Sequence, residues 1–230
     1  MSTRTISTTK TSAPGSPPKD SALEFHNRLI EEKGVHAASG FSQRSRNTRF
    51  HIIERCLREF PDPDLTVLDY GCNDGALFDC LKGSVTRYIG MDINPKLIKW
   101  AKERWKDRAN GKAKFKVGNA LEDETYDRLL LLKPDVIIAS GVMSYRGDAR
   151  SYPELIYRLF TCAQHGVIFN VLTADAPKNL VVPQKSLVRW KPEQLLKLVR
   201  ACGCNSWEVI RSYLHNDMTV VMRKQWTHFT

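Results

Sequence analysis

The stretch VLDYGCNDG at residues 67–75 decides the fold. The strand-like pattern of residues 65–70 predicts a strand, and Gly71, Asn73 and Gly75 follow it before a helical pattern begins. Glycine adopts a positive φ freely, and asparagine is among the few other residues that tolerate one, so the chain can turn sharply here. The stretch therefore predicts a turn whose backbone approaches a ligand at the end of a strand.

Strands and helices alternate around this turn. Strands are expected at 65–70, 86–92, 113–117, 135–140 and 166–172, and helices at 75–82, 95–108, 122–132 and 152–164. Such alternation is typical of parallel strands joined by crossover helices. A last helix at 192–201 precedes two β-rich stretches, 206–213 and 218–223, which predict an antiparallel hairpin at the sheet edge. We expect an α/β fold with a seven-stranded, mostly parallel sheet.

The residues before the first strand divide into two parts. Residues 1–20 contain nine Ser or Thr and three Pro but almost nothing apolar, which is typical of a disordered tail. In residues 21–64, apolar side chains such as Phe50, Ile53 and Leu57 recur at helical spacing. We expect a helical lid there, in front of a core formed by residues 65–230.

Composition bounds the class of protein. With 230 residues, 42% of them hydrophobic, the chain can bury the core of one globular domain. Its apolar runs are far shorter than the roughly 20 residues that a membrane helix needs, so we expect a cytoplasmic protein with no membrane contact. The six cysteines include no CxxC pair or zinc-finger spacing, so we expect reduced thiols and no metal site.

The positive charge is concentrated in one segment. The net charge is +10, and residues 96–116 carry nine Lys or Arg against Glu103 and Asp107. Clustered basic residues favour binding to phosphates, so a nucleic-acid partner is one hypothesis. However, a row of charged residues along a helix is more commonly a solvent-exposed surface than a binding site.

A second strand end carries an acid. Asp92 follows Asp69 by 23 residues, at a position from which a carboxylate can accept hydrogen bonds from both ribose hydroxyls. The dinucleotide fingerprint would need glycine where this sequence has Asn73, which disfavours a pyrophosphate ligand. Alone, Asp92 could simply cap the following helix and Asn119 could be a turn former. Together and in this order, they favour a cofactor that contains a nucleoside.

Four segments resemble the successive motifs of class I S-adenosylmethionine-dependent methyltransferases. They are VLDYGCNDG (67–75), GMDINP (90–95), GNALED (118–123) and PDVIIASG (134–141). Over about residues 33–224 the chain is also similar to small bacterial and phage methyltransferases of mostly unassigned substrate. The resemblance implies a Rossmann-like fold, S-adenosylmethionine as the cofactor and an enzyme that transfers its methyl group.

The resemblance also implies where the cofactor binds. The Gly71 loop would contact its methionine part, Asp92 its ribose, and Arg49 its carboxylate, with Arg44 and Arg46 as alternatives. The complete set that it implies is Arg49, Asp69, Gly71, Cys72, Asn73, Gly75, Asp92, Ile93, Asn119, Ala120, Ser140 and Gly141. The family usually has glycine where this chain has Asn73. We expect this difference to affect how tightly the cofactor binds rather than which cofactor it is.

Catalytic residues are harder to identify, because methyl transfer depends mainly on positioning the two reactants. His215 or Asp217 could act as a general base for a hydroxyl acceptor, and Tyr145 is a further candidate at the same sheet edge. The Asn/Asp-Pro-Pro-Tyr/Phe tetrad of many nucleic-acid amino methyltransferases is absent after the fourth strand, where residues 139–142 read ASGV.

Three functions remain open from the sequence. The leading hypothesis is O- or N-methylation of a small molecule. The alternative is an RNA or DNA acceptor, favoured by the net charge, by Arg44 and Arg46, and by Trp190 between Arg189 and Lys191. The third is an inactive cofactor-binding partner subunit, with Asn73 as an early sign of decay. The acceptor and the oligomeric state are left open.

Overall fold

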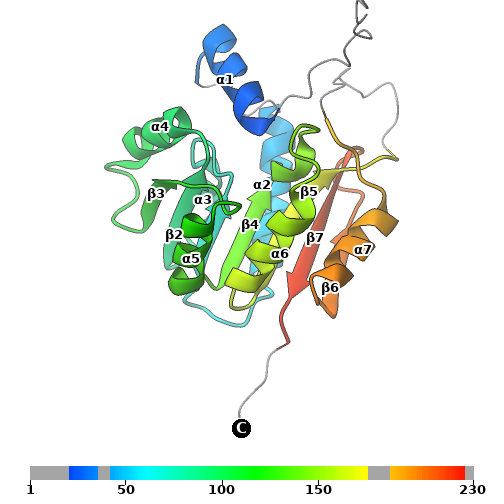
Figure 1. Cartoon of the computed structure of the whole chain (residues 1–230). Helices are drawn as coiled ribbons and strands as arrows, with labels where there is room; N and C mark the ends of the chain where they lie inside the picture. The colour runs from blue at the N-terminus through cyan, green and yellow to red at the C-terminus, as the bar shows by residue number, and fades with distance from the viewer. Residues whose placement is uncertain (1–20, 36–41, 176–186, 226–230) are drawn as a thin grey trace, which may run out of the picture.

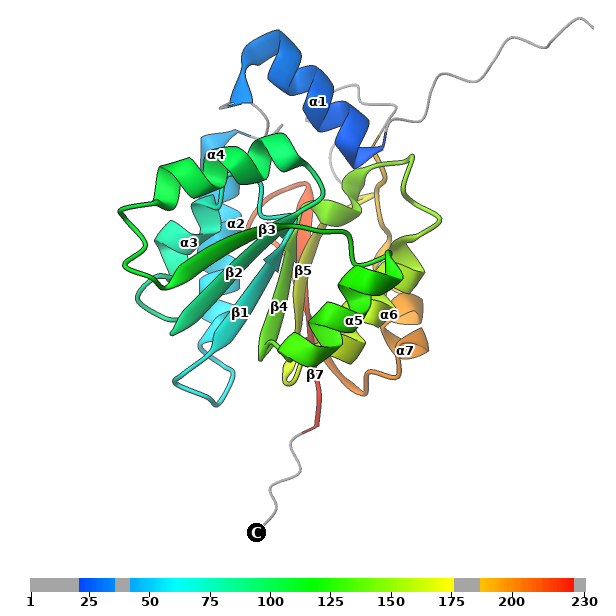
Figure 2. The same cartoon turned by 60° about the vertical axis from the view of Figure 1, so that its left-hand side comes forward.

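The computed structural model describes residues 21–35, 42–175 and 187–225. One seven-stranded sheet runs through it in the order β3-β2-β1-β4-β5-β7-β6 (Figures 1 and 2). The strands are β1 (Thr66–Tyr70), β2 (Arg87–Asp92), β3 (Ala113–Val117), β4 (Val136–Ser140), β5 (Gly166–Leu172), β6 (Ser206–Ile210) and β7 (Asp217–Arg223). The first five pair in parallel, and β7 is antiparallel to both β5 and β6.

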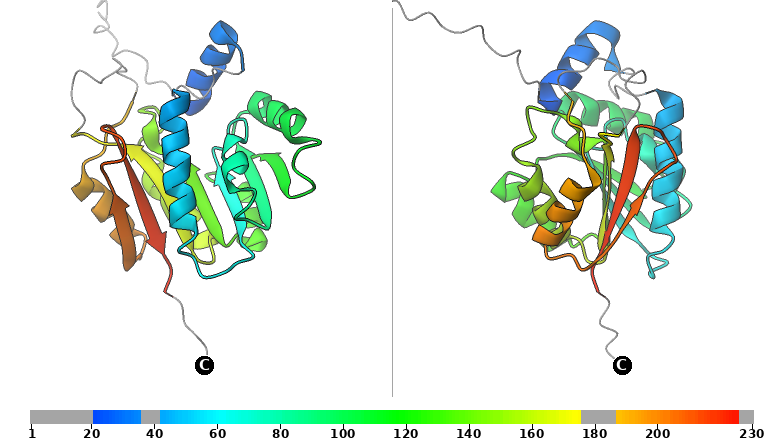
Figure 3. Two further views of the ribbon diagram at one scale, coloured as in Figure 1. Left: turned by 180° about the vertical axis from the view of Figure 1, so that it is seen from behind. Right: turned by 90° about the vertical axis from the view of Figure 1, so that its right-hand side faces the viewer.

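Helices cover both faces of the sheet. They are α1 (Ala22–Lys33), α2 (Gln43–Leu57), α3 (Ala76–Leu81), α4 (Pro95–Trp105), α5 (Asp123–Leu132), α6 (Tyr152–Cys162) and α7 (Pro192–Ala201), with the short 3-10 helix η2 (Val142–Ser144). Apolar side chains of α2, α3 and α4 form one core layer with the sheet. Those of α5, α6 and α7 form the other, so the architecture has three layers (Figures 2 and 3).

Local sequence explains these elements. All seven residues of β5 are buried, as expected for a strand that is covered by helices on both faces. The helix α4 begins at Asn94, whose side chain accepts a hydrogen bond from the Lys96 backbone at 2.9 Å, and Pro95 occupies its first turn. The carboxyl end of β2 is thereby joined directly to a capped helix.

The expected α/β fold with its C-terminal antiparallel hairpin is confirmed, and the element bounds agree to within three residues. The strand expected at 206–213 ends at Ile210, because Ser212 has a φ of 72° and cannot continue an extended strand. The tail at 1–20 lies outside the described residues.

The two N-terminal helices differ in their packing. The helix α2 contributes Ile53, Cys56 and Leu57 to the core, whereas α1 has no buried residue. Figure 1 shows α1 above the carboxyl ends of the strands. Of the lid expected at residues 21–64, therefore, only α1 stands apart from the core.

Two expectations, on membrane helices and on cysteines, can be compared with all the described residues. None of its helices has the length and apolar character that crossing a membrane requires. All six cysteines lie in this part of the chain, and all six are free thiols.

Candidate active site

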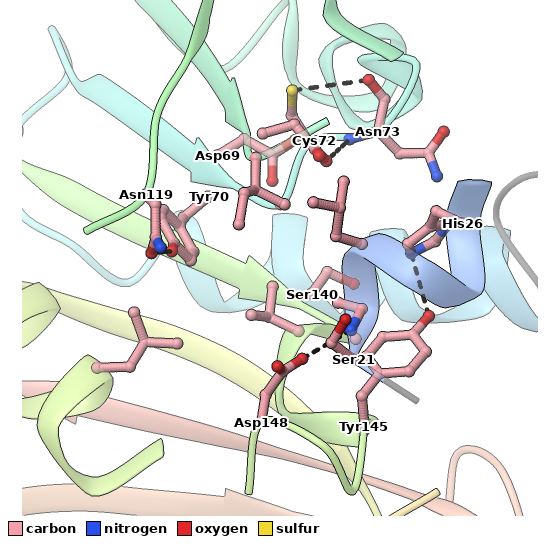
Figure 4. A pocket seen from close by; sticks show the side chains of 18 of the residues that line it. Ser21, His26, Asp69, Tyr70, Cys72, Asn73, Asn119, Ser140, Tyr145 and Asp148 are labelled. Carbon is pink, nitrogen blue, oxygen red and sulfur yellow. Dashed lines mark hydrogen bonds between the residues drawn. The ribbon is translucent and has the colours of Figure 1, made fainter. Parts of the chain in front are cut away.

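The carboxyl ends of β1, β2 and β4 open into a cavity of about 310 Å³ below α1 (Figure 4). This volume lies in the usual range of small-molecule sites. Ten of the residues expected around a cofactor line it: Arg49, Asp69, Gly71, Cys72, Asn73, Asp92, Ile93, Asn119, Ser140 and Gly141. Of the other two, Gly75 precedes α3 as its N-cap, and Ala120 is fully buried outside the lining.

The loop after β1 is held in a conformation that needs its glycines. Gly71, Asn73 and Gly75 have φ values of 77°, 51° and 70°, which confirms that Asn73 takes up a left-handed conformation. A Cβ atom on Gly71 would lie 2.5 Å from Cγ2 of Val142, and one on Gly75 would lie 2.5 Å from the Phe115 ring. A larger side chain at either position would therefore displace the cavity wall or the core.

Asp74 anchors this loop to α4. Its carboxylate contacts the guanidinium of Arg104, and its backbone carbonyl accepts a hydrogen bond from Nε1 of Trp105 at 3.1 Å. Asp74 is 4% exposed, so this pair is largely shielded from water. One member of the basic run at 96–116 is thus part of the site's support.

Asp92 presents its carboxylate to the cavity from the end of β2. Its Oδ2 accepts a hydrogen bond from the Asn73 backbone and its Oδ1 accepts one from the Asn94 backbone, both at 2.9 Å. Burial raises the pKa of Asp92, and these two N–H donors oppose that shift. A carboxylate has about four lone-pair sites, so acceptor capacity remains for hydroxyl groups of a ligand.

Asp69 lies deeper in the cavity wall and is 2% exposed. The hydroxyl of Tyr88 donates a short hydrogen bond to its Oδ2. Burial raises the pKa of Asp69 to about 7, although this hydrogen bond acts in the opposite direction. Asp69 therefore carries a proton more readily than an exposed aspartate.

Tyr70 organises the loop after β3. Its hydroxyl donates to Oδ1 of Asn119 and accepts from the Ala120 backbone, both at 3.2 Å, while Oδ1 of Asn119 also accepts from the Leu121 backbone. Ala120 thus supports the site from behind. The sequence pattern missed Tyr70, because a tyrosine in a buried strand looks like an ordinary core residue.

Arg49 and Asp217 form a buried ion pair beside the cavity. Nε of Arg49 donates to Oδ2 of Asp217 at 2.6 Å. The other carboxylate oxygen accepts from Asn170, whose own side-chain oxygen accepts from the Gly141 backbone at 2.9 Å. Burial raises the pKa of Asp217, and the charge of Arg49 opposes this shift. Arg49 lines the cavity, whereas Asp217 stands behind it.

The three residues expected to act in catalysis are not brought together. Tyr145 lines the cavity, but Asp217 is engaged with Arg49, and His215 is exposed outside the lining. His215 lies in the connection between β6 and β7, and β5 lies between β7 and β4, the nearest strand that opens into the cavity. The shared carboxyl edge of the sheet therefore does not bring His215 to the cavity.

A second arginine faces the cavity from α2. Arg46 lines it with Nη1 3.9 Å from Oδ2 of Asp74. Its Nε is buried and has no hydrogen-bond partner in the described part of the chain. A buried guanidinium N–H without an acceptor is costly, so this atom indicates a place for an anionic group.

Comparison with known proteins identifies the family. The sequence matches the family model described as a methyltransferase domain over residues 42–226. The chain belongs to this methyltransferase family. It is a class I S-adenosylmethionine-dependent methyltransferase with a Rossmann-like fold, as the four motifs implied.

Relatives of this methyltransferase include a candidate methyltransferase of Mycobacterium tuberculosis, which is 27% identical over 173 residues, or 71% of this chain and 95% of that protein. Magnesium protoporphyrin IX methyltransferase from Synechocystis PCC 6803, with bound S-adenosylmethionine, shares 17% identity at a TM-score of 0.61 over 91% of this chain and 100% of its own. An O-methyltransferase family protein from Burkholderia thailandensis shares 15% identity at a TM-score of 0.66, over 90% and 64% respectively. These two structures share the fold.

The helix α1 adds residues to the methyltransferase site that sequence reasoning missed. Nε2 of His26 lies 3.1 Å from the Tyr145 hydroxyl, and the Ala22 backbone donates to Oδ2 of Asp148 at 2.7 Å (Figure 4). Asn94 donates to Oδ1 of Asn27 at 3.0 Å, which ties α1 to the start of α4. No motif could reveal His26, because it lies far upstream of the strand ends.

Proposed function

We propose that this methyltransferase transfers the methyl group to an oxygen or nitrogen of a small-molecule acceptor. The observation that carries the proposal is the position of α1 across the mouth of the cavity, which leaves a site of small-molecule size. None of the basic residues at 96–116 is among its described lining residues. Both features favour a compact acceptor over a polymer.

The cofactor supplies a methyl group on a positively charged sulfur, and the chain's residues position it. The Asp92 carboxylate would accept hydrogen bonds from the ribose hydroxyls, since the backbone N–H groups of Asn73 and Asn94 already fix its orientation. Ile93 and the Asn119 segment flank the adenine, and the Gly71 loop with Asp69 borders the methionine part. Ser140 and Gly141 close the opposite wall.

For the cofactor carboxylate we favour Arg46 over Arg49. Nε of Arg49 is engaged with Asp217, whereas Nε of Arg46 is buried without a described partner. A carboxylate bound by the Arg46 guanidinium would satisfy that N–H with a charge-assisted hydrogen bond. The preference for Arg49 that the resemblance suggested is thereby revised.

The acceptor then occupies the side of the cavity below α1, next to His26 and Tyr145. The bound cofactor would supply the methyl group as its carbon–sulfur bond breaks, with the bonding pair left on sulfur, and a hydroxyl or amine acceptor would have to lose a proton. His26, hydrogen-bonded to Tyr145, is placed to take that proton, whereas His215 is exposed and is not among the described lining residues.

The first test is calorimetric titration with S-adenosylmethionine. We expect binding to the wild type and a loss of affinity in Asp92→Ala, with thermal unfolding as the control for folding. Turnover is then sought by incubating the enzyme with labelled donor and a panel of phenols, carboxylic acids and amines. Absence of cofactor binding, or equal affinity in Asp92→Ala, would refute the assignment.

An RNA or DNA acceptor is the second candidate. One observation favours it: eight of the nine basic residues at 96–116 are exposed on α4, β3 and the loop between them. This candidate requires nucleic-acid binding that weakens steeply with salt, and methylation of the bound strand. An inactive partner subunit, the third possibility, would bind the cofactor without any turnover.

A further inference from the structure

A cluster of three potential metal ligands lies on the surface that α2 and α3 share. His51 and Glu54 belong to α2 and Cys80 to α3, and one ligand atom from each lies within 4.8 Å of the other two. Figure 3 shows these two helices side by side at the back of the sheet. None of the three residues is among the described lining of the cavity.

The distances suit a tetrahedral ion. Oε2 of Glu54 lies 3.9 Å from Nδ1 of His51 and 3.7 Å from Sγ of Cys80. Zinc bonds of about 2.0–2.3 Å to nitrogen, oxygen and sulfur imply ligand separations of about 3.4–3.6 Å around a tetrahedron. The two separations from Glu54 thus exceed these values by only a few tenths of an ångström, and the third, between His51 and Cys80, is within 4.8 Å. Water can occupy the fourth position.

The carboxylate is already oriented for this role. Arg58 donates to Oε1 of Glu54 at 2.6 Å, which turns Oε2 toward the imidazole and the thiol. His51, Glu54 and Arg58 are spaced at i, i+3 and i+7, so they share one face of the chain's helical segment. In metal sites, a carboxylate is commonly held in place by a hydrogen bond to the oxygen that does not bind the metal.

We propose that His51, Glu54 and Cys80 bind one Zn²⁺ ion that links α2 to α3. Imidazole, carboxylate and thiolate are all zinc ligands, and the thiolate selects against magnesium and calcium. The site is separate from the methyl-transfer cavity. Its occupation would fix α2, the helix that carries Arg46 and Arg49 to the cavity.

Binding requires the Cys80 thiol to lose its proton to the solvent as the sulfur–zinc bond forms. Burial and the neighbouring Glu54 raise the pKa of Cys80 to about 11 in the metal-free protein. Zinc must displace this proton, so affinity will increase with pH across the neutral range.

The experiment uses the full-length, metal-free protein with a phosphine reductant present. Cobalt(II) is titrated and the thiolate-to-cobalt charge-transfer absorption is followed, and zinc is then added in competition. We expect one ion per chain. Cys80→Ser should abolish the charge-transfer band, and His51→Gln should weaken zinc binding about tenfold or more.

The matched control is Cys202→Ser, which removes another half-buried thiol and should leave the titration unchanged. Circular dichroism of each variant checks folding. Absence of the band in the wild type, or its persistence in Cys80→Ser, would overturn the proposal. Zinc binding that survives in Cys80→Ser but is lost in Asp62→Asn would assign the ion to Asp62, Asp135 and His165 instead.

Discussion

Arg49 and Asp217 are joined by a buried ion pair with 2.6 Å between Nε and Oδ2, although 168 positions separate them in the chain. The pair links α2 to the antiparallel strand β7. Through Asn170 it reaches the backbone of Gly141, which lines the cavity. The last strand of the sheet thus fixes a wall of the site without contributing a lining residue of its own.

Asp217→Asn should destabilise the protein by about 3–5 kcal/mol, because it leaves the Arg49 charge buried without its partner. Urea denaturation measures the loss. Arg211→Ala is the control: it breaks the exposed pair with Asp175 and should cost less than about 1 kcal/mol. A stable Asp217→Asn enzyme with lost turnover would instead support the general-base role that the sequence suggested.

Arg46→Ala should remove the preference for ligands that carry the amino-acid carboxylate. The wild type should bind S-adenosylhomocysteine more tightly than 5′-methylthioadenosine, and Arg46→Ala should reduce this difference by about 10-fold or more, since a hydrogen bond to a charged group is lost. Calorimetry of both ligands gives the ratio. Arg44→Ala, at an exposed position, is the control; loss of discrimination only in Arg49→Ala would restore the original assignment.

Asp69 should make the protein less stable as pH rises. Its pKa is about 7 in the native state and near 3.9 when unfolded, so between these values the native state holds a proton that the unfolded state lacks. Protonation of native Asp69 contributes on the order of 4 kcal/mol to the free energy of unfolding. This contribution is complete below about pH 4 and is lost by about pH 7.

Asp69→Asn should abolish this dependence, because the amide cannot ionise but can still accept from Tyr88. Denaturation of both proteins at about pH 5 and about pH 8 tests it: the variant should gain stability relative to the wild type at the higher pH. A difference that stays constant with pH would show that Asp69 does not titrate in this range.

Gly71→Ala should weaken both folding and cofactor binding. The new Cβ would meet Val142 at 2.5 Å and force a non-glycine residue to a φ of 77°, where the backbone strain alone costs about 1–2 kcal/mol. Thermal unfolding and cofactor titration measure the two effects. Adding Val142→Ala should restore only the steric part; Gly83→Ala, where a Cβ meets no atom within 4 Å, should be close to neutral.

His26→Asn should lower kcat by about 10²–10⁴-fold for an acceptor found in the panel, while cofactor affinity stays the same. Tyr145→Phe, which keeps the ring and removes the hydroxyl, should have a smaller effect. His165→Asn, remote from the cavity lining, controls for loss of a histidine. Unchanged kcat in His26→Asn would rule out proton transfer to this residue.

The fold and ten of the residues that line the cavity could be predicted because their signals are local. The Gly71 loop, Asp92 and Asn119 each follow a buried strand directly, and parallel strands bring their ends to one edge. The proposed choice of Arg46 over Arg49 could not be made from the sequence, because it rests on Asp217, which the fold brings from the other end of the chain.

The acceptor half was not predictable for a related reason. The helix α1 has no buried residue, so the core pattern that locates other helices gives no sign of where it lies. His26 approaches the cavity from this helix, whereas His215, which was predicted from the correct sheet edge, lies in the β6–β7 connection outside the described lining. Likewise, the proposed zinc ligands are spread over α2 and α3, so they leave no spacing pattern in the sequence.

The attachment of α1, through polar and aromatic contacts but without a buried residue, separates the proposed acceptor side of the cavity from the core that keeps the enzyme folded. The helix touches the cavity through contacts such as His26 to Tyr145 and Ala22 to Asp148, yet none of its side chains is part of the core. With the acceptor bound below α1 as proposed, substitutions along this helix would reshape the cavity for a different acceptor at little cost to folding. In evolution, acceptor choice could thus change rapidly on an unchanged cofactor-binding scaffold.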